Sequence, residues 1–175
     1  SLIHNKEKTE QKSNILTEIN DVVIKNNNQE TENTHFSDIS KNIEEKGAYL
    51  FRKLTGQCVG VHVRRTDHTE AIANSPLALF AERMKKELET VADTSFFVAT
   101  DDKEVRRELK ELLPDAKLIF PQSDVIDRDS KEGIEEAFIE MLALSKCRKI
   151  LGSYNSTFSL LPSYIGNIPL ETVHK

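Results

Sequence analysis

One stretch of the chain indicates its architecture: Cys58-Val59-Gly60-Val61-His62-Val63-Arg64-Arg65-Thr66-Asp67. Residues 58–63 are an apolar, valine-rich run with the length of one strand, and charged residues follow them. Strands that are apolar on both faces are typical of parallel sheets covered by helices on both sides. Ligands bind such sheets beyond the carboxyl ends of the strands. The charged residues after this run therefore occupy the place where we expect a binding site.

The remainder of the chain alternates apolar runs with amphipathic segments. Further buried strands are predicted at 96–99, 117–120, 149–151 and 168–170. Amphipathic helices are predicted between them, within 76–91, 105–112 and 134–145, and from Ser156 or Thr157 onward. The alternation predicts an α/β fold, a Rossmann-like three-layer arrangement with a parallel sheet in the middle.

Length and composition are those of an ordinary globular domain. The chain has 175 residues, of which 38% are hydrophobic and 30% are charged, and its net charge is -5, which disfavours nucleic acid as a partner. No stretch approaches the roughly 20 apolar residues of a membrane span. Residues 1–37 are polar, which predicts a poorly ordered or short helical segment, and residues 38–175 are predicted to form the domain.

The cysteines and histidines show no spacing typical of a metal site. Cys58 and Cys147 both lie in or beside apolar runs, without the paired spacing of a zinc or redox motif, so we interpret them as buried thiols rather than as a disulfide. The five histidines are scattered along the chain. No metal is predicted.

Two consecutive arginines follow the first predicted strand. Arg64 and Arg65 stand where a nucleotide-binding fold of this kind normally has a glycine-rich turn. A guanidinium is permanently charged and planar, and it can grip a phosphate through two parallel hydrogen bonds. The pair could therefore neutralise a diphosphate without a metal. The alternative is a surface pair whose charge is balanced by Asp67 and Glu70.

Polar residues also follow the second and the fourth predicted strands. After the second strand, Asp101 either accepts hydrogen bonds from a ribose or a guanine or caps the next helix, whereas Asp102 is interpreted as a cap. After the fourth strand, residues 152–158 form a hydroxyl-rich loop that opens a helix and could present amides and hydroxyls to a phosphate. The alternative interpretation of this loop is helix capping alone.

Together these three segments resemble the fucosyltransferase superfamily, including the α1,6-fucosyltransferases and the nodulation fucosyltransferases, over roughly residues 57–166. The quoted run from Val59 to Asp67 looks like the first motif of that family, and Val98-Ala99-Thr100-Asp101-Asp102 looks like its second. Residues 142–147 followed by 153–158 are similar to its third. The resemblance implies that the chain is equivalent to the C-terminal nucleotide-sugar-binding domain of a GT-B glycosyltransferase.

The resemblance also implies roles in binding the donor. Arg64 and Arg65 would contact the diphosphate of GDP, His62 would support the nucleotide pocket, and Asp101 would meet the guanine. The loop after the fourth strand would hold ribose or phosphate and offer a ring for stacking or packing, through Asn155, Ser156, Thr157 and Phe158.

The implied reaction is an inverting, metal-independent transfer of fucose, or of a related sugar, from its GDP-linked donor to a hydroxyl of a glycan or protein acceptor. Arg64 would stabilise the departing diphosphate. Thr69-Glu70-Ala71 matches the segment that holds the catalytic glutamate of the α1,6 enzymes if the loop here is two residues shorter. Glu70 is therefore the candidate base, with Asp67 as its substitute. Both could instead be solvated carboxylates that balance the arginines.

Residues 1–37 are too short and too polar to be the acceptor domain of a two-domain enzyme. The sequence is therefore either a fragment or a minimal relative, and a nucleotide-sugar-binding module without turnover is the alternative function. A small interaction protein whose arginines meet an acidic partner is a third. The compartment stays open: a cytoplasmic location is favoured, and a lumenal location in the Golgi or endoplasmic reticulum would follow if an upstream anchor had been removed.

Overall fold

A computed structural model describes residues 36–66, 69–123 and 129–175, with no side chains described before residue 41. The chain divides into two units, Ser1–Glu45 and Lys46–Lys175. The predicted polar segment, apart from its last two residues, lies outside the described part, so the predicted domain boundary stays a prediction. The second unit contains the sheet.

The second unit is built on a five-stranded parallel sheet in the order β3-β2-β1-β4-β5. Its strands are β1 (Cys58–Val63), β2 (Ser95–Thr100), β3 (Lys117–Ile119), β4 (Lys149–Ser153) and β5 (Leu170–Val173). Every residue of β1 and β2 is buried. This is the burial that an uninterrupted apolar run predicts for a central parallel strand.

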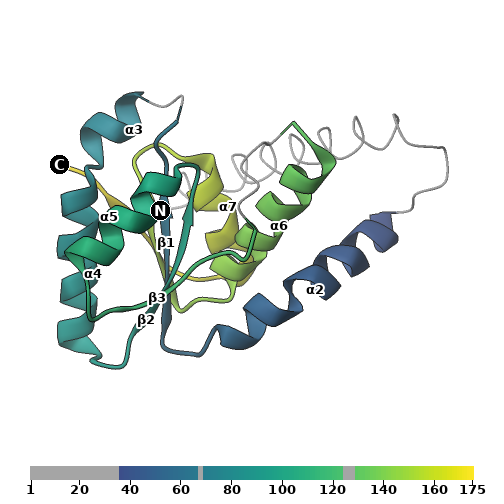
Figure 1. The fold of residues 1–175 in the computed structure, drawn as a ribbon, viewed down its shortest axis with the longest axis horizontal. Helices are drawn as coiled ribbons and strands as arrows, with labels where there is room; N and C mark the ends of the chain where they lie inside the picture. The colour runs from purple at the N-terminus through teal and green to yellow at the C-terminus, as the bar shows by residue number, and fades with distance from the viewer. Residues whose placement is uncertain (1–35, 67–68, 124–128) are drawn as a thin grey trace, which may run out of the picture. The chain divides into compact units, whose positions relative to one another are not determined.

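Helices cover both faces of this sheet, which confirms the predicted three-layer α/β fold (Figure 1). The helices α4 (Leu77–Thr90) and α5 (Lys103–Leu112) lie on one side, and α6 (Lys131–Ser145) and α7 (Thr157–Gly166) lie on the other. Along the chain, α2 (Phe36–Lys53) precedes β1, and a short helix, α3 (Thr69–Asn74), follows β1. No helix in the described ranges is both long and apolar enough to cross a membrane.

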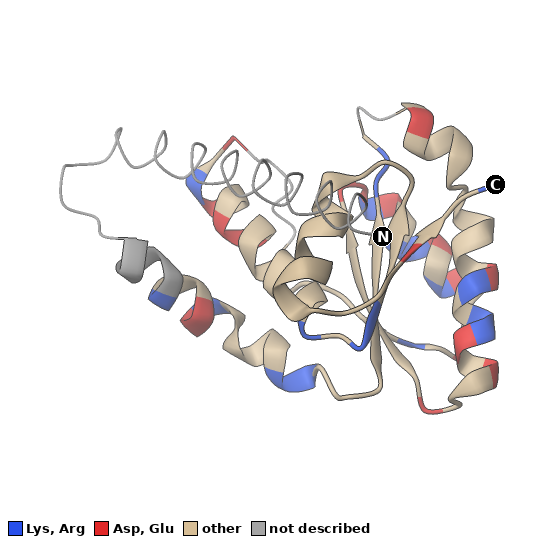
Figure 2. Cartoon of the chain, turned by 180° about the vertical axis from the view of Figure 1, so that it is seen from behind, with Lys and Arg blue, Asp and Glu red and all other residues tan. Residues whose placement is uncertain are grey.

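Charged side chains are distributed unevenly over these elements (Figure 2). Basic and acidic residues follow one another along α4, whereas most of the sheet carries neither kind of residue. The helix α4 turns Leu77, Phe80, Ala81 and Met84 inward. Most of its charged residues are exposed, as expected for an amphipathic helix on a buried sheet, whereas Arg83 and Glu87 are partly buried and form ion pairs with Glu171 and with Arg148 and Lys149.

The alternation of side chains along β1 assigns each residue to one face of the sheet. Val59, Val61 and Val63 belong to the apolar core formed with α4 and α5. The intervening residues face the opposite layer, where Gly60 lies beside Leu144 of α6 and His62 contacts α7. Apolar residues thus pack on both faces of β1, and the face toward α6 and α7 also carries the buried histidine.

The two cysteines are buried free thiols, as predicted. Cys58 begins β1 and Cys147 follows α6, and their sulfur atoms are 3.8 Å apart. The hydrogen bond that Cys147 donates to Cys58, together with burial, raises the pKa of the Cys147 thiol well above its usual range. Both groups act as small apolar packing residues.

Two elements differ from the sequence prediction. The last strand was expected at 168–170, but β5 begins only at Leu170. The cause is the end of α7: Asn167 adopts a left-handed conformation with φ 50°, and the amide of Ile168 donates to the carbonyl of Ser163, so the turn extends the helix cap. The helix α3, which contains Glu70, was not predicted, because its six residues are too few for a clear helical period.

Candidate functional site

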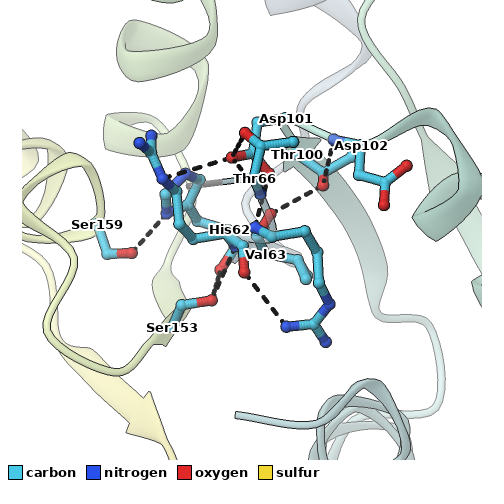
Figure 3. Close-up of polar contacts among 10 residues, drawn as sticks. His62, Val63, Thr66, Thr100, Asp101, Asp102, Ser153 and Ser159 are labelled. Atoms are coloured by element: carbon cyan, nitrogen blue, oxygen red, sulfur yellow. Dashed lines mark hydrogen bonds and ion pairs between the residues drawn. The ribbon is translucent and has the colours of Figure 1, made fainter. Parts of the chain in front are cut away.

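The polar residues that follow β1, β2 and β4 lie side by side at one edge of the sheet (Figure 3). The strand order is the reason, because β1 lies between β2 and β4 and all three run in the same direction. The loop that carries the two arginines therefore has Asp101, after β2, on one flank and Ser153, at the end of β4, on the other. We call this loop, residues 64–66, the arginine loop.

Asp101 holds the arginine loop through its carboxylate. One oxygen, Oδ1, accepts a hydrogen bond from the amide of Arg65 at 2.7 Å. The other, Oδ2, accepts from the amide of Thr66 at 3.1 Å and from its hydroxyl at 2.6 Å, and it lies 3.4 Å from Nε of Arg64. The residue is only 5% exposed. A buried carboxylate of this kind requires such partners, because an unpaired buried charge is costly.

Ser153 holds the opposite flank of the arginine loop. Its hydroxyl accepts a hydrogen bond from the amide of Arg64 at 2.8 Å and donates to the carbonyl of His62 at 3.3 Å. On the other side, the hydroxyl of Thr100 donates to the carbonyl of Val63 at 2.8 Å. The backbone from 62 to 66 is therefore fixed by side chains from both neighbouring strands.

The two arginine side chains differ in their surroundings. The side chain of Arg64 is 27% exposed, and within the described residues its two terminal amino groups have no partner, since only Nε is paired. The side chain of Arg65 donates from Nη1 to the carbonyl of Arg64 at 3.2 Å. Burial lowers the pKa of Arg65, an effect that the nearby carboxylate of Asp101 opposes. Arg65 stays charged all the same, because a guanidinium cannot be deprotonated in a protein.

His62 is buried against the first turn of α7. It is 1% exposed, and its Nδ1 lies 2.6 Å from the hydroxyl of Ser159. The ring of Phe158 lies 4.9 Å from the imidazole, centroid to centroid. The position of Ser159 beside β4 requires a glycine at residue 152, because a Cβ there would stand 2.7 Å from the hydroxyl of Ser159. The close approach of β4 to α7 thus fixes the imidazole in place.

The backbone of the loop between β4 and α7 has a conformation that favours asparagine at position 155. Asn155 has φ 52°, a left-handed conformation that asparagine tolerates better than most residues. The amide of Tyr154 before it donates to the hydroxyl of Ser75 at 2.8 Å. Ser156 occupies the N-cap position of α7, but its side chain makes no capping hydrogen bond, and Thr157 is exposed. These hydroxyls are thus not consumed by capping, which was the alternative interpretation of the loop.

Some of the predicted site residues contact one another in the structure, and others do not. It brings His62, Arg64, Arg65 and Asp101 into one network, with Phe158 against the imidazole. In the described part of the chain, the loop residues Asn155, Ser156 and Thr157 make no hydrogen bond or ion pair to the arginine loop.

Three further carboxylates were considered from the sequence: Asp102, Glu70 and Asp67. Asp102 caps α5 by accepting from the amide of Glu104 at 3.0 Å, which confirms its interpretation as a cap. Glu70 lies in the first turn of α3 and is exposed. Asp67 lies outside the described residues. The roles of Glu70 and Asp67 stay predictions.

Sequence reasoning assigned no role in this network to Thr66, Thr100 or Ser159, and it included Ser153 only as part of the hydroxyl-rich loop. Ser153, Ser159 and Thr100 are buried, with 2%, 1% and 4% exposure. The signal in the sequence is that these hydroxyls stand in or beside apolar segments, where a hydroxyl needs a partner. Across the described ranges, no group of three His, Cys, Asp or Glu side chains is arranged to hold a metal ion.

The sheet and its helices form a fold like that of part of the solved fucosyltransferases. No protein-family model and no curated protein matches the sequence. The fold is recognised from solved structures instead.

Three of these structures represent two kinds of fucosyltransferase. POFUT1 in complex with GDP aligns with a TM-score of 0.55 and 16% identity, over 75% of this chain and 47% of that one. POFUT1 in complex with GDP-fucose gives 0.54 and 16%, over 74% and 45%. The fucosyltransferase NodZ from Bradyrhizobium gives 0.50 and 22%, over 72% and 41%. The chain therefore spans less than half the length of the structures that it matches.

Proposed function

We propose that this chain binds GDP-fucose or a related GDP-linked sugar and takes part in inverting, metal-independent transfer of the sugar to a hydroxyl of a glycan or protein acceptor. The observation that carries the proposal is the arginine loop, which is fixed at the carboxyl end of the central strand of a fucosyltransferase-like fold. The similar structures with GDP and with GDP-fucose support this choice of donor.

The arginine loop suits a diphosphate for a physical reason. Nε of the Arg64 guanidinium lies 3.4 Å from Asp101, and the edge between its two terminal amino groups lies at the opposite end of the group. A planar pair of N–H groups matches two phosphate oxygens. The arginines bring two positive charges to the loop, and the nearby carboxylates of Asp101, Glu108 and Asp102 act on Arg65. We infer that the diphosphate of the donor pairs with Arg64, whose terminal amino groups have no partner among the described residues.

The proposed transfer is a single displacement. The acceptor hydroxyl oxygen forms a bond to the anomeric carbon of the sugar while the bond from that carbon to the β-phosphate oxygen breaks. The bonding electrons leave with GDP, whose developing charge Arg64 stabilises. The hydroxyl proton passes to a carboxylate, for which Glu70 is the proposed base and Asp67 the substitute.

The alternative is a nucleotide-sugar-binding module without turnover. In either case the acceptor would be recognised mostly by parts of the protein other than the sheet. The proposed compartment is the cytoplasm, with a Golgi or endoplasmic reticulum lumen for a protein that has an upstream anchor.

The test is calorimetric titration of GDP and GDP-fucose into this chain without added metal, repeated with Arg64→Ala. We expect saturable binding that Arg64→Ala weakens by about tenfold or more, since hydrogen bonds to charged groups contribute about 1.5–3 kcal/mol. Arg107→Ala is the matched control, because Arg107 is exposed and paired only with carboxylates of its own helix. Thermal unfolding of each variant checks that it is folded.

The outcomes separate the two functions. Binding with transfer of fucose to an acceptor supports the enzyme, and binding without transfer supports the module. Absence of binding, or binding that Arg64→Ala leaves unchanged, would refute both.

A further inference from the structure

The carboxylate of Asp101 is largely occupied by contacts within the protein. A carboxylate offers about four lone-pair positions on its two oxygens. Oδ2 receives two hydrogen bonds from Thr66 and lies beside Nε of Arg64, and Oδ1 receives one hydrogen bond, from the amide of Arg65. The residue is also 5% exposed, so a guanine or ribose has little surface to contact.

The backbone amides of the arginine loop also donate hydrogen bonds within the protein. The amide of Arg64 is taken by Ser153, and those of Arg65 and Thr66 are taken by Asp101. In a glycine-rich phosphate loop, consecutive amides of this kind turn toward the phosphate instead. Here the carboxylate of Asp101 occupies the position of the anion in that arrangement. The loop therefore offers side chains, and not its backbone, to a phosphate.

The same contacts orient Arg64. Its Nε lies beside Oδ2 of Asp101, the oxygen that also receives the hydroxyl and amide of Thr66. With Nε beside the carboxylate, the edge of the rigid, planar guanidinium that lies between its two terminal amino groups points away from Nε, along the axis of the side chain. A long, mobile side chain is thereby restricted before any ligand arrives, which reduces the entropy that binding must overcome.

We propose that Asp101 is a positioning residue, which folds the arginine loop around its own carboxylate and holds Arg64 for the diphosphate, and that it does not contact the base. This inference rests on the proposed function, since it needs a nucleoside diphosphate at the site. It replaces the role in guanine recognition that the sequence resemblance implied for Asp101.

The test compares Asp101→Asn with the matched variant Asp102→Asn. The first substitution keeps the shape of the side chain, but it removes the charge and one of the two acceptor oxygens. Asp102 is the adjacent carboxylate and caps α5 instead, a role that asparagine performs equally well. The affinities of GDP, UDP and inorganic pyrophosphate are measured by calorimetry for both variants, for Arg64→Ala and for the double variant Arg64→Ala with Asp101→Asn.

We expect Asp101→Asn to weaken GDP, UDP and pyrophosphate by the same factor, about tenfold or more, so that the ratio of GDP to UDP affinity does not change. The double variant should bind no more weakly than Arg64→Ala alone, because the carboxylate acts through that arginine. Asp102→Asn should leave all three affinities unchanged. A role confined to folding would not produce this coupling.

Other outcomes overturn the inference. If Asp101→Asn changes the ratio of GDP to UDP affinity and leaves pyrophosphate binding intact, Asp101 recognises the base. If the losses multiply in the double variant, Asp101 does not act through Arg64. Should Asp101→Asn not fold, Thr66→Val removes one donor to Oδ2, and unchanged pyrophosphate affinity in that variant counts against the proposal. Failure of the unsubstituted chain to bind GDP would instead refute the proposed function, and that result is seen before any substitution is made.

Discussion

Replacing Gly166 with alanine tests how tightly α7 packs against α6. Gly166 is the last residue of α7, and a Cβ there would lie 2.1 Å from the carbonyl oxygen of Ser145, the last residue of α6. The carbonyl carbon and Cα of Ser145 would be 2.9 and 3.2 Å away. All three atoms belong to the backbone and cannot rotate aside. Since carbon and oxygen atoms normally approach to about 3.3 Å, the two helix ends must separate by roughly 1 Å.

Two opposing terms set the magnitude of the effect. Alanine favours a helix over glycine by about 1 kcal/mol. Overpacking a close contact costs about 1–3 kcal/mol, and the upper end applies to Gly166 because backbone is the obstacle. We expect Gly166→Ala to lower the free energy of unfolding by about 2 kcal/mol, which corresponds to a fall in Tm of about 4–8 °C for a chain of this size.

The assay is urea unfolding followed by far-ultraviolet circular dichroism, with Gly56→Ala as the control. A Cβ at Gly56 would meet nothing within 4 Å, and no glycine of the described residues has a positive φ. Gly56→Ala should therefore be neutral or raise the free energy of unfolding by up to about 1 kcal/mol. If Gly166→Ala is as stable as the unsubstituted chain, the reasoning from the α6–α7 contact is wrong.

Two further predictions concern the charged and the buried side chains. Burial opposes the ionisation of Glu87, but its hydrogen bonds with Lys149 and Arg148 outweigh burial and lower its pKa. The contribution of Glu87 to the free energy of unfolding should therefore be present above about pH 4.5 and be lost as the pH falls below that value. Urea unfolding at several pH values should show a smaller loss of stability on acidification in Glu87→Gln, and equal losses would contradict the expectation. Cys58 and Cys147 are 0% and 2% exposed, so a thiol reagent should label them only as fast as the protein opens; rapid labelling in native buffer would show that they are not buried.

Several features of this protein follow from local sequence alone. The apolar runs Cys58–Val63 and Ser95–Thr100 are long enough for strands and lack charged positions, which is the pattern of strands buried on both faces. The separating segments repeat their apolar residues at helical spacing. Arg64 and Arg65 directly follow a predicted strand, so their position at the carboxyl edge of the sheet could be inferred before any contact was known.

The contacts that shape the site depend on which strands become neighbours. His62 and Ser159 are 97 positions apart in the chain, and Arg65 and Asp101 are 36 apart. Local patterns carry no information about such pairs, because the strand order arises from crossovers that bring β2 and β4 to the two sides of β1. The sequence could therefore place a carboxylate after β2, but only the folded sheet shows that both oxygens of Asp101 accept hydrogen bonds from the arginine loop. Burial makes that difference: with so little of its surface reaching solvent, the carboxylate takes its donors from the protein itself.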